Sequence, residues 1–197
     1  MKKQLSLLLL LASSTIFSQQ LSIDDFRSLI PFLQKQDYKG AFEKSETLLN
    51  TTTADTTDAR AQVSYINIYA SAGMVTLDQM SYDAFEKSIK KFVGKKLKMP
   101  GHPCVSDSVK VVYNSFQFLT EKGKTQGYTM TANKDKTNIL LFEYFDFKEG
   151  FVPENMVGKN VRATGILQSY EVNPNKSKIW IGRLHLAPSY VNRFVPN

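Results

Sequence analysis

The chain has 197 residues, a formal net charge of +7, two histidines and a single cysteine. A single cysteine excludes an intramolecular disulfide, so an ordinary apolar core must stabilise the fold. The basic residues are spread along the chain rather than gathered in one block. This pattern is typical of a solvated surface and leaves attraction to an anionic partner as the alternative.

Residues 1–18 have the pattern of a secretory signal peptide. Two lysines precede an apolar run from Leu5 to Ala12, and small and polar residues follow up to Ser18. The run is too short to span a bilayer, and no later apolar run reaches that length. We expect a mature chain that starts at Gln19, carries a net charge of +5 because two lysines are removed, and is periplasmic or extracellular.

From residue 21 to residue 93, apolar side chains recur at helical spacing, which predicts a domain of four helices packed as antiparallel pairs. Pro31 should kink or shorten the first helix, which begins with the capping pair Ser22 and Asp25. Gly73 is the expected stop of the third helix. The four apolar stripes run from Ile23 to Leu33, from Tyr38 to Leu49, from Val63 to Ala70 and from Tyr82 to Phe92.

The helical half resembles the helical hairpins of tetratricopeptide (TPR) repeats. The run Asp37–Phe42 is similar to the turn and second-helix start of such a repeat, with Tyr38 and Ala41 at matching positions. Tyr69 and Gly73 fall where a second repeat would place its aromatic residue and its turn glycine. The resemblance implies a protein-binding or peptide-binding surface rather than catalysis.

Residues 94–108 interrupt the helical period. Gly94, Pro100, Gly101 and Pro103 break both helices and strands, so we expect a linker between two domains here. Two prolines in a short linker favour a fixed arrangement of the two halves.

The remaining residues, 109–197, indicate short strands separated by turns marked by glycine, proline and asparagine. Five or six such strands suggest a small closed or half-closed antiparallel barrel. The predicted class is therefore α+β, with helical hairpins before the barrel. The expected strands cover residues 110–120, 126–132, 138–147, 160–172 and 178–187, with a hairpin turn at residues 173–176.

The sequence VGKNVRATGIL at residues 157–167 resembles the fourth strand of an OB-fold, which often begins with a VGK-x-V phrase and bends at a glycine. The run from Ile179 to Leu186 is similar to the closing strand of that fold. The resemblance implies one face that binds oligonucleotides, oligosaccharides or proteins, and it leaves the ligand open.

Aromatic residues alternate with basic residues in the β half, a mixture that can stack on bases or sugar rings. A barrel core also needs large side chains, so part of this set must point inward. The candidates for a binding face combine a flat or apolar body with a polar group: Tyr113, Tyr128, Tyr144, Trp180, Arg162 and Arg183.

Cys104 lies two residues after His102, and His185 lies on the last expected strand. These side chains could form a zinc site or a cysteine–histidine nucleophile, but the spacing fits neither, and the ordinary interpretation is a half-buried thiol in a linker. We therefore expect no metal ligands, no cofactor and no catalytic residues.

Three acidic residues lie close together near the end of the third expected strand. Glu143 and Asp146 should project from opposite faces, so they cannot act together as a glycosidase pair. We expect both, with Glu149, to be solvated at a strand end.

The leading hypothesis is a secreted, non-enzymatic binding or adaptor protein that recognises a protein partner. One alternative is a module that binds carbohydrate or an anionic polymer, and another is a hydrolase that uses Cys104 with His102 or His185. A secreted location disfavours nucleic acid as the partner.

Overall fold

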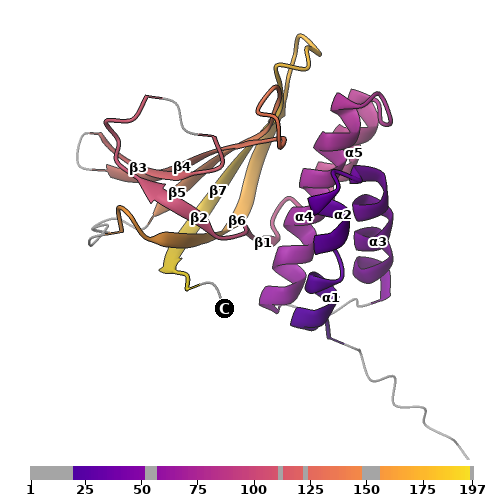
Figure 1. Cartoon of the computed structure of the whole chain (residues 1–197), viewed down its shortest axis with the longest axis horizontal. Helices are drawn as coiled ribbons and strands as arrows, with labels where there is room; N and C mark the ends of the chain where they lie inside the picture. The colour runs from indigo at the N-terminus through magenta and orange to yellow at the C-terminus, as the bar shows by residue number, and fades with distance from the viewer. Residues whose placement is uncertain (1–19, 52–56, 111–112, 122–123, 148–155, 196–197) are drawn as a thin grey trace, which may run out of the picture.

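The computed structural model describes residues 20–51, 57–110, 113–121, 124–147 and 156–195. Within these residues, helices precede a mixed sheet, so the predicted α+β class is confirmed (Figure 1). The expected signal peptide at residues 1–18 and the start at Gln19 lie outside the described residues.

The helical half contains short helices at its start and longer ones after them. The Ser22 and Asp25 capping box forms as predicted and begins the first helix. Pro31 stands in the first turn of the second helix, so the single first helix that we expected is divided in two. The helices are α1 (Ile23–Arg27), α2 (Ile30–Gln34), α3 (Tyr38–Thr51), α4 (Asp58–Thr76) and α5 (Tyr82–Lys90).

Gly73 does not end α4, which continues to Thr76, so the predicted stop is wrong. Gly73 instead allows α3 and α4 to pack closely. A Cβ atom at Gly73 would lie 2.3 Å from Cγ of the buried Tyr38 ring on α3. The ring of Tyr38 also meets that of Tyr69, with centroids 5.8 Å apart. The absent side chain therefore makes room for the Tyr38 ring between α3 and α4.

Helix α4 is buried along almost its whole length, because it lies between the other helices and the sheet. Polar side chains on it are paired with its neighbours. Asn67 donates hydrogen bonds to Ser45 and Glu46 of α3, and Ser71 accepts one from Ser88 of α5. The remaining face of α4 lies against the sheet (Figure 1).

The segment at residues 94–108, which we expected to be a linker, contains two strands of the sheet. Leu97 pairs with Gly165, and His102 pairs with Val161. Gly94, Pro100 and Gly101 lie beside or between these strands, and Pro103 lies within the second one, which is too short to show a period. The strands are β1 (Lys96–Lys98), β2 (His102–Val105), β3 (Phe116–Glu121), β4 (Lys124–Ala132), β5 (Ile139–Phe147), β6 (Asn160–Val172) and β7 (Trp180–Arg193).

These strands form one seven-stranded mixed sheet in the order β1-β6-β2-β3-β4-β5-β7, and β6 also pairs with β7. The purely antiparallel barrel that we predicted is corrected, because β2 runs parallel to β3 and β5 runs parallel to β7. For β5 and β7, the cause is the hairpin of β6 and β7. Strand β7 turns back from β6 and pairs with β5 on its other edge, and this position makes it parallel to β5.

The helices and the sheet share one apolar core, which supports the fixed arrangement that we expected. Phe85 of α5 packs against Gly182 of β7, where an added Cβ would lie 3.1 Å from the ring. The Tyr82 hydroxyl donates a 2.8 Å hydrogen bond to the carbonyl oxygen of Ser177. None of the described helices is both long enough and apolar enough to cross a bilayer.

Candidate functional site

Four of the six predicted binding residues gather on one face of the sheet, the face of β4, β5 and β7 that points away from the core. Tyr128 on β4 is the register partner of Tyr144 on β5. Phe142 on β5 is the register partner of Arg183 on β7. We define the aromatic face as Tyr128, Phe142, Tyr144, Trp180 and Arg183, all half-buried.

The rings of the aromatic face contact one another in a continuous series. Tyr128 lies 5.2 Å from Tyr144 and 6.2 Å from Phe142, measured between ring centroids, and the second pair is stacked. Phe142 meets Trp180 edge to face at 6.1 Å. These contacts pack the rings against one another without any ligand present.

Arg183 lies over this series and adds a positive charge. Its guanidinium carbon is 4.3 Å from the Trp180 centroid and 5.6 Å from the Phe142 centroid. The same guanidinium donates a 2.8 Å hydrogen bond to Glu171 on β6. Part of the face is therefore aromatic and part is polar.

A shallow pocket of about 210 Å³ adjoins the aromatic face. Tyr144, Arg183 and His185 line it, together with residues of β6 that include Glu171. Nε2 of His185 lies 2.7 Å from an Asp146 carboxylate oxygen at the edge of the same face. The pocket thus offers hydrogen-bond donors and acceptors beside flat rings.

Burial also affects the chemistry of Tyr128. It raises the pKa of the hydroxyl well above its usual value, and the nearby Tyr144 and Glu143 add to the shift. The hydroxyl therefore stays protonated and can donate a hydrogen bond to a ligand.

The other two predicted binding residues lie elsewhere. The guanidinium carbon of Arg162 on β6 is 4.0 Å from the ring centroid of Phe194. Tyr113 stands in the turn before β3, and no ring contact joins it to the aromatic face within the described part of the chain.

Cys104 and the two histidines do not form a nucleophilic pair in the described ranges. Cys104 is buried, and burial raises the pKa of its thiol, which keeps it protonated. His185 pairs with Asp146, whereas Nδ1 of His102 lies 2.9 Å from the carbonyl oxygen of Asn114. Among the residues that the structure describes, no cluster of three acidic, histidine or cysteine side chains could hold a metal ion.

Glu143 is completely buried, so the expectation of a solvated strand end is wrong for this residue. Its carboxylate accepts a 2.6 Å hydrogen bond from Tyr65 of α4 and bonds from Thr129 and Thr131 of β4. Burial raises the pKa of the Glu143 carboxyl to about 7, although these hydrogen bonds oppose the shift. The sequence predicted only that Glu143 and Asp146 project from opposite faces, and the burial of Glu143 follows from the position of α4 against the sheet.

Asp146 lies on the opposite face, as predicted, and is half-exposed. Its carboxylate accepts a 2.6 Å hydrogen bond from Gln126 and pairs with His185. The third acidic residue, Glu149, lies outside the described residues.

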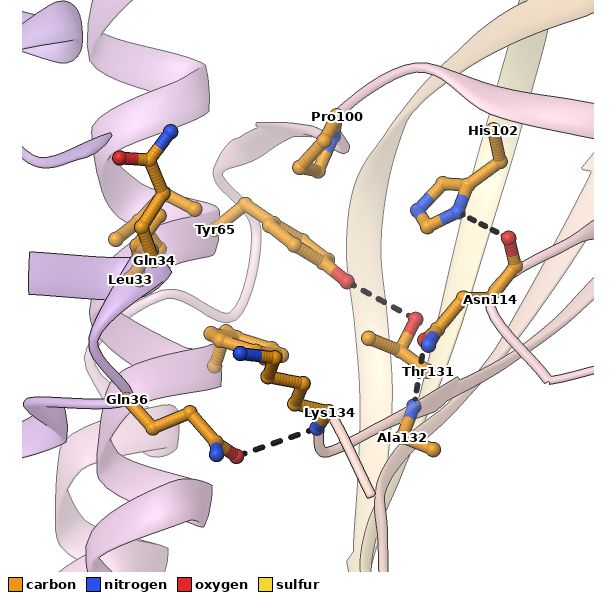
Figure 2. A pocket seen from close by; sticks show the side chains of 12 residues that line it. Leu33, Gln34, Gln36, Tyr65, Pro100, His102, Asn114, Thr131, Ala132 and Lys134 are labelled. Atoms are coloured by element: carbon orange, nitrogen blue, oxygen red, sulfur yellow. Dashed lines mark hydrogen bonds between the residues drawn. The ribbon is translucent and has the colours of Figure 1, made fainter. Parts of the chain in front are cut away.

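A larger cavity of about 520 Å³ lies between the helices and the sheet. Figure 2 shows Tyr65 extending from the helices toward Thr131, with the ring of His102 on the sheet side. This cavity could not be predicted from the sequence, because its lining comes from segments far apart in the chain: residues 33–36, 65–69, 100–102, 114 and 131–134.

Comparisons with known proteins do not identify a family. No protein-family model, no curated protein and no solved structure matches the chain. The function must therefore be argued from the residues of the site.

Proposed function

We propose that the protein is a secreted, non-enzymatic binding protein that recognises a protein partner through its aromatic face. The observation that carries this proposal is the series of packed rings that includes Tyr128, Tyr144 and Trp180, with the guanidinium of Arg183 over it. Tyrosine, tryptophan and arginine are the residues that most often dominate binding energy in protein interfaces.

The helical half was the expected binding surface, but its apolar side chains are already buried against other parts of the protein. Helix α4 is buried between α3, α5 and the sheet, so the inner face of the hairpin has no room for a peptide. We retain a TPR-like hairpin as a proposal for α3 and α4 only, supported by the packing of Tyr38 against Tyr69 and Gly73.

We also propose that the sheet is OB-like. Support comes from the hairpin of β4 and β5 and from the place of β7, which is parallel to β5 and antiparallel to β6. Strands β1 and β3 are additions to the usual five strands. OB-folds bind ligands on the face of their second and third strands, which in this alignment are β4 and β5.

A saccharide is the second candidate ligand. The pocket beside Tyr144 favours it, because Glu171, Arg183 and His185 could bond hydroxyl groups while the adjacent rings stack on a sugar. An anionic polymer would bind to Arg183 mainly through its charge, so its affinity would fall steeply with added salt.

The test is a pull-down from a detergent-solubilised envelope extract of the source organism, at low and at moderate salt, with mass spectrometry as the readout. The variant carries Tyr128→Ala and Trp180→Ala, and the matched control carries Lys39→Ala and Lys44→Ala on the exposed side of α3.

We expect one protein to be retained at both salt concentrations by the wild type and the control, and at least about tenfold less by the aromatic variant. Equal retention by the two variants would overturn the proposed surface. Retention of glycan alone would replace the protein partner with the second candidate.

A further inference from the structure

The cavity between the helices and the sheet contains a polar atom whose hydrogen-bonding capacity is unused. His102 is 8% exposed, and its Nε2 is buried without a hydrogen-bond partner in the described residues. Figure 2 shows Nε2 on the side of the ring that faces the cavity, while Nδ1 is directed toward Asn114. An unpaired buried acceptor or donor costs free energy, so this atom indicates a missing partner.

The contact with Asn114 determines which kind of partner is missing. A carbonyl oxygen only accepts hydrogen bonds, so Nδ1 carries the hydrogen in its 2.9 Å contact with Asn114. Burial lowers the pKa of His102, so the ring is neutral. Nε2 is therefore an acceptor, and the partner it lacks is a hydrogen-bond donor.

Three other polar side chains that line the cavity, those of Tyr65, Thr131 and Asn114, already have partners. The Tyr65 hydroxyl donates to Glu143, and the Thr131 hydroxyl donates to the same carboxylate. The side-chain oxygen of Asn114 accepts a 2.8 Å hydrogen bond from the backbone N–H of Ala132. Among the described lining residues, Nε2 of His102 is therefore the buried side-chain atom that lacks a hydrogen-bond partner and that a ligand could satisfy.

Most of the surface of the cavity is apolar, and Gln34, Gln36 and Lys134 add polar groups to its lining. Leu33 and Ile66 come from the helices, and Pro100 and Ala132 come from the sheet side. A volume of about 520 Å³ is within the range of small-molecule sites. Apolar walls with one unsatisfied acceptor fit a compact apolar body that carries a single donor group.

We propose that this cavity is a second binding site, separate from the aromatic face, for a small apolar molecule with a hydroxyl group that donates a hydrogen bond to Nε2 of His102. The site does not depend on the proposed protein partner. It lies on the inner side of the sheet, where Thr131 and Glu143 point, whereas Tyr128 and Tyr144 point outward.

The test uses two probes of nearly equal shape, p-cresol and toluene, which differ by the hydroxyl group. Each is titrated into the purified protein and followed by two-dimensional NMR, with shifts at Ile66 and Ala132 as the readout of this site. We expect p-cresol to bind about threefold to tenfold more tightly than toluene, as one neutral hydrogen bond predicts.

Two variants assign the effect to the cavity. His102→Phe removes the acceptor and should make the affinities of the two probes equal. Ala132→Leu fills the cavity and should abolish binding of both probes while the protein remains folded. No shifts at millimolar probe, equal affinities for the wild type, or an unchanged p-cresol preference in His102→Phe would each overturn the proposal.

Discussion

Glu143 is the residue with the largest expected effect on pH dependence. Its carboxyl pKa rises from an ordinary value of 4.5 to about 7 in the folded protein. The folded state therefore binds more protons than the unfolded state between these values, and stability must fall as pH rises through this window. A shift of this size corresponds to about 3 kcal/mol of unfolding free energy.

We predict that the unfolding free energy of Glu143→Gln falls much less with rising pH than that of the wild type. The amide oxygen can still accept from Tyr65, and the amide group can donate to the hydroxyl of Thr129 or Thr131, so the bonds are largely kept without a charge. The measurement is urea unfolding of both proteins from about pH 5 to about pH 8.

Glu43→Gln is the matched control, because Glu43 lies exposed on α3 and makes only a 3.9 Å ion pair with Lys39. The unfolding free energy of Glu43→Gln should depend on pH in the same way as that of the wild type. Parallel stability profiles for the wild type and Glu143→Gln would contradict a titrating Glu143.

The packing of α3 against α4 depends on Gly73. Alanine ordinarily stabilises a helix interior relative to glycine by about 1 kcal/mol. Here the clash should dominate, because the new Cβ would lie 2.3 Å to 2.6 Å from atoms of the buried Tyr38 ring. We predict that Gly73→Ala lowers the unfolding free energy by about 1–3 kcal/mol.

A double-mutant cycle separates the clash from other effects of the substitution. In a Tyr38→Ala background the ring is gone, so Gly73→Ala should be neutral or slightly stabilising. An equal cost of Gly73→Ala in both backgrounds, measured by urea unfolding, would show that the Tyr38 ring is not the cause.

Elements with a clear period were predictable from the sequence, whereas short ones were not. Strand β6 has the predicted bounds of residues 160–172, because a long alternating run between turn residues has few other solutions. Strands β1 and β2, with three and four residues, lie among glycines and prolines and are specified mainly by their pairing with β6.

The candidate site was predictable to a similar degree. Tyr128, Tyr144 and Arg183 share a face because strand alternation and register bring them together. Trp180 is three residues before Arg183, so alternation does not predict its place, and it joins the face through the contacts of its ring. The environment of Glu143 and the cavity beside His102 depend on how α4 meets the sheet. A single sequence contains no local signal for such long-range contacts.

The whole molecule should unfold as one unit, because its core includes residues from the helices and from the sheet. Trp180 is the only tryptophan and lies on β7, so its fluorescence reports on the sheet. Far-ultraviolet circular dichroism reports mainly on the helices. We predict coincident urea midpoints for the two signals, and separate midpoints would indicate independent halves.

Site-specific photo-crosslinking tests most directly whether the molecule binds its partner through the aromatic face. A photoreactive phenylalanine analogue replaces Tyr144 on that face in one version and Lys44 on the exposed side of α3 in the other. Each protein is irradiated in intact cells of the source organism. We predict one specific crosslinked protein from position 144 and none from position 44. The reverse pattern, or the same product from both positions, would contradict binding through the aromatic face.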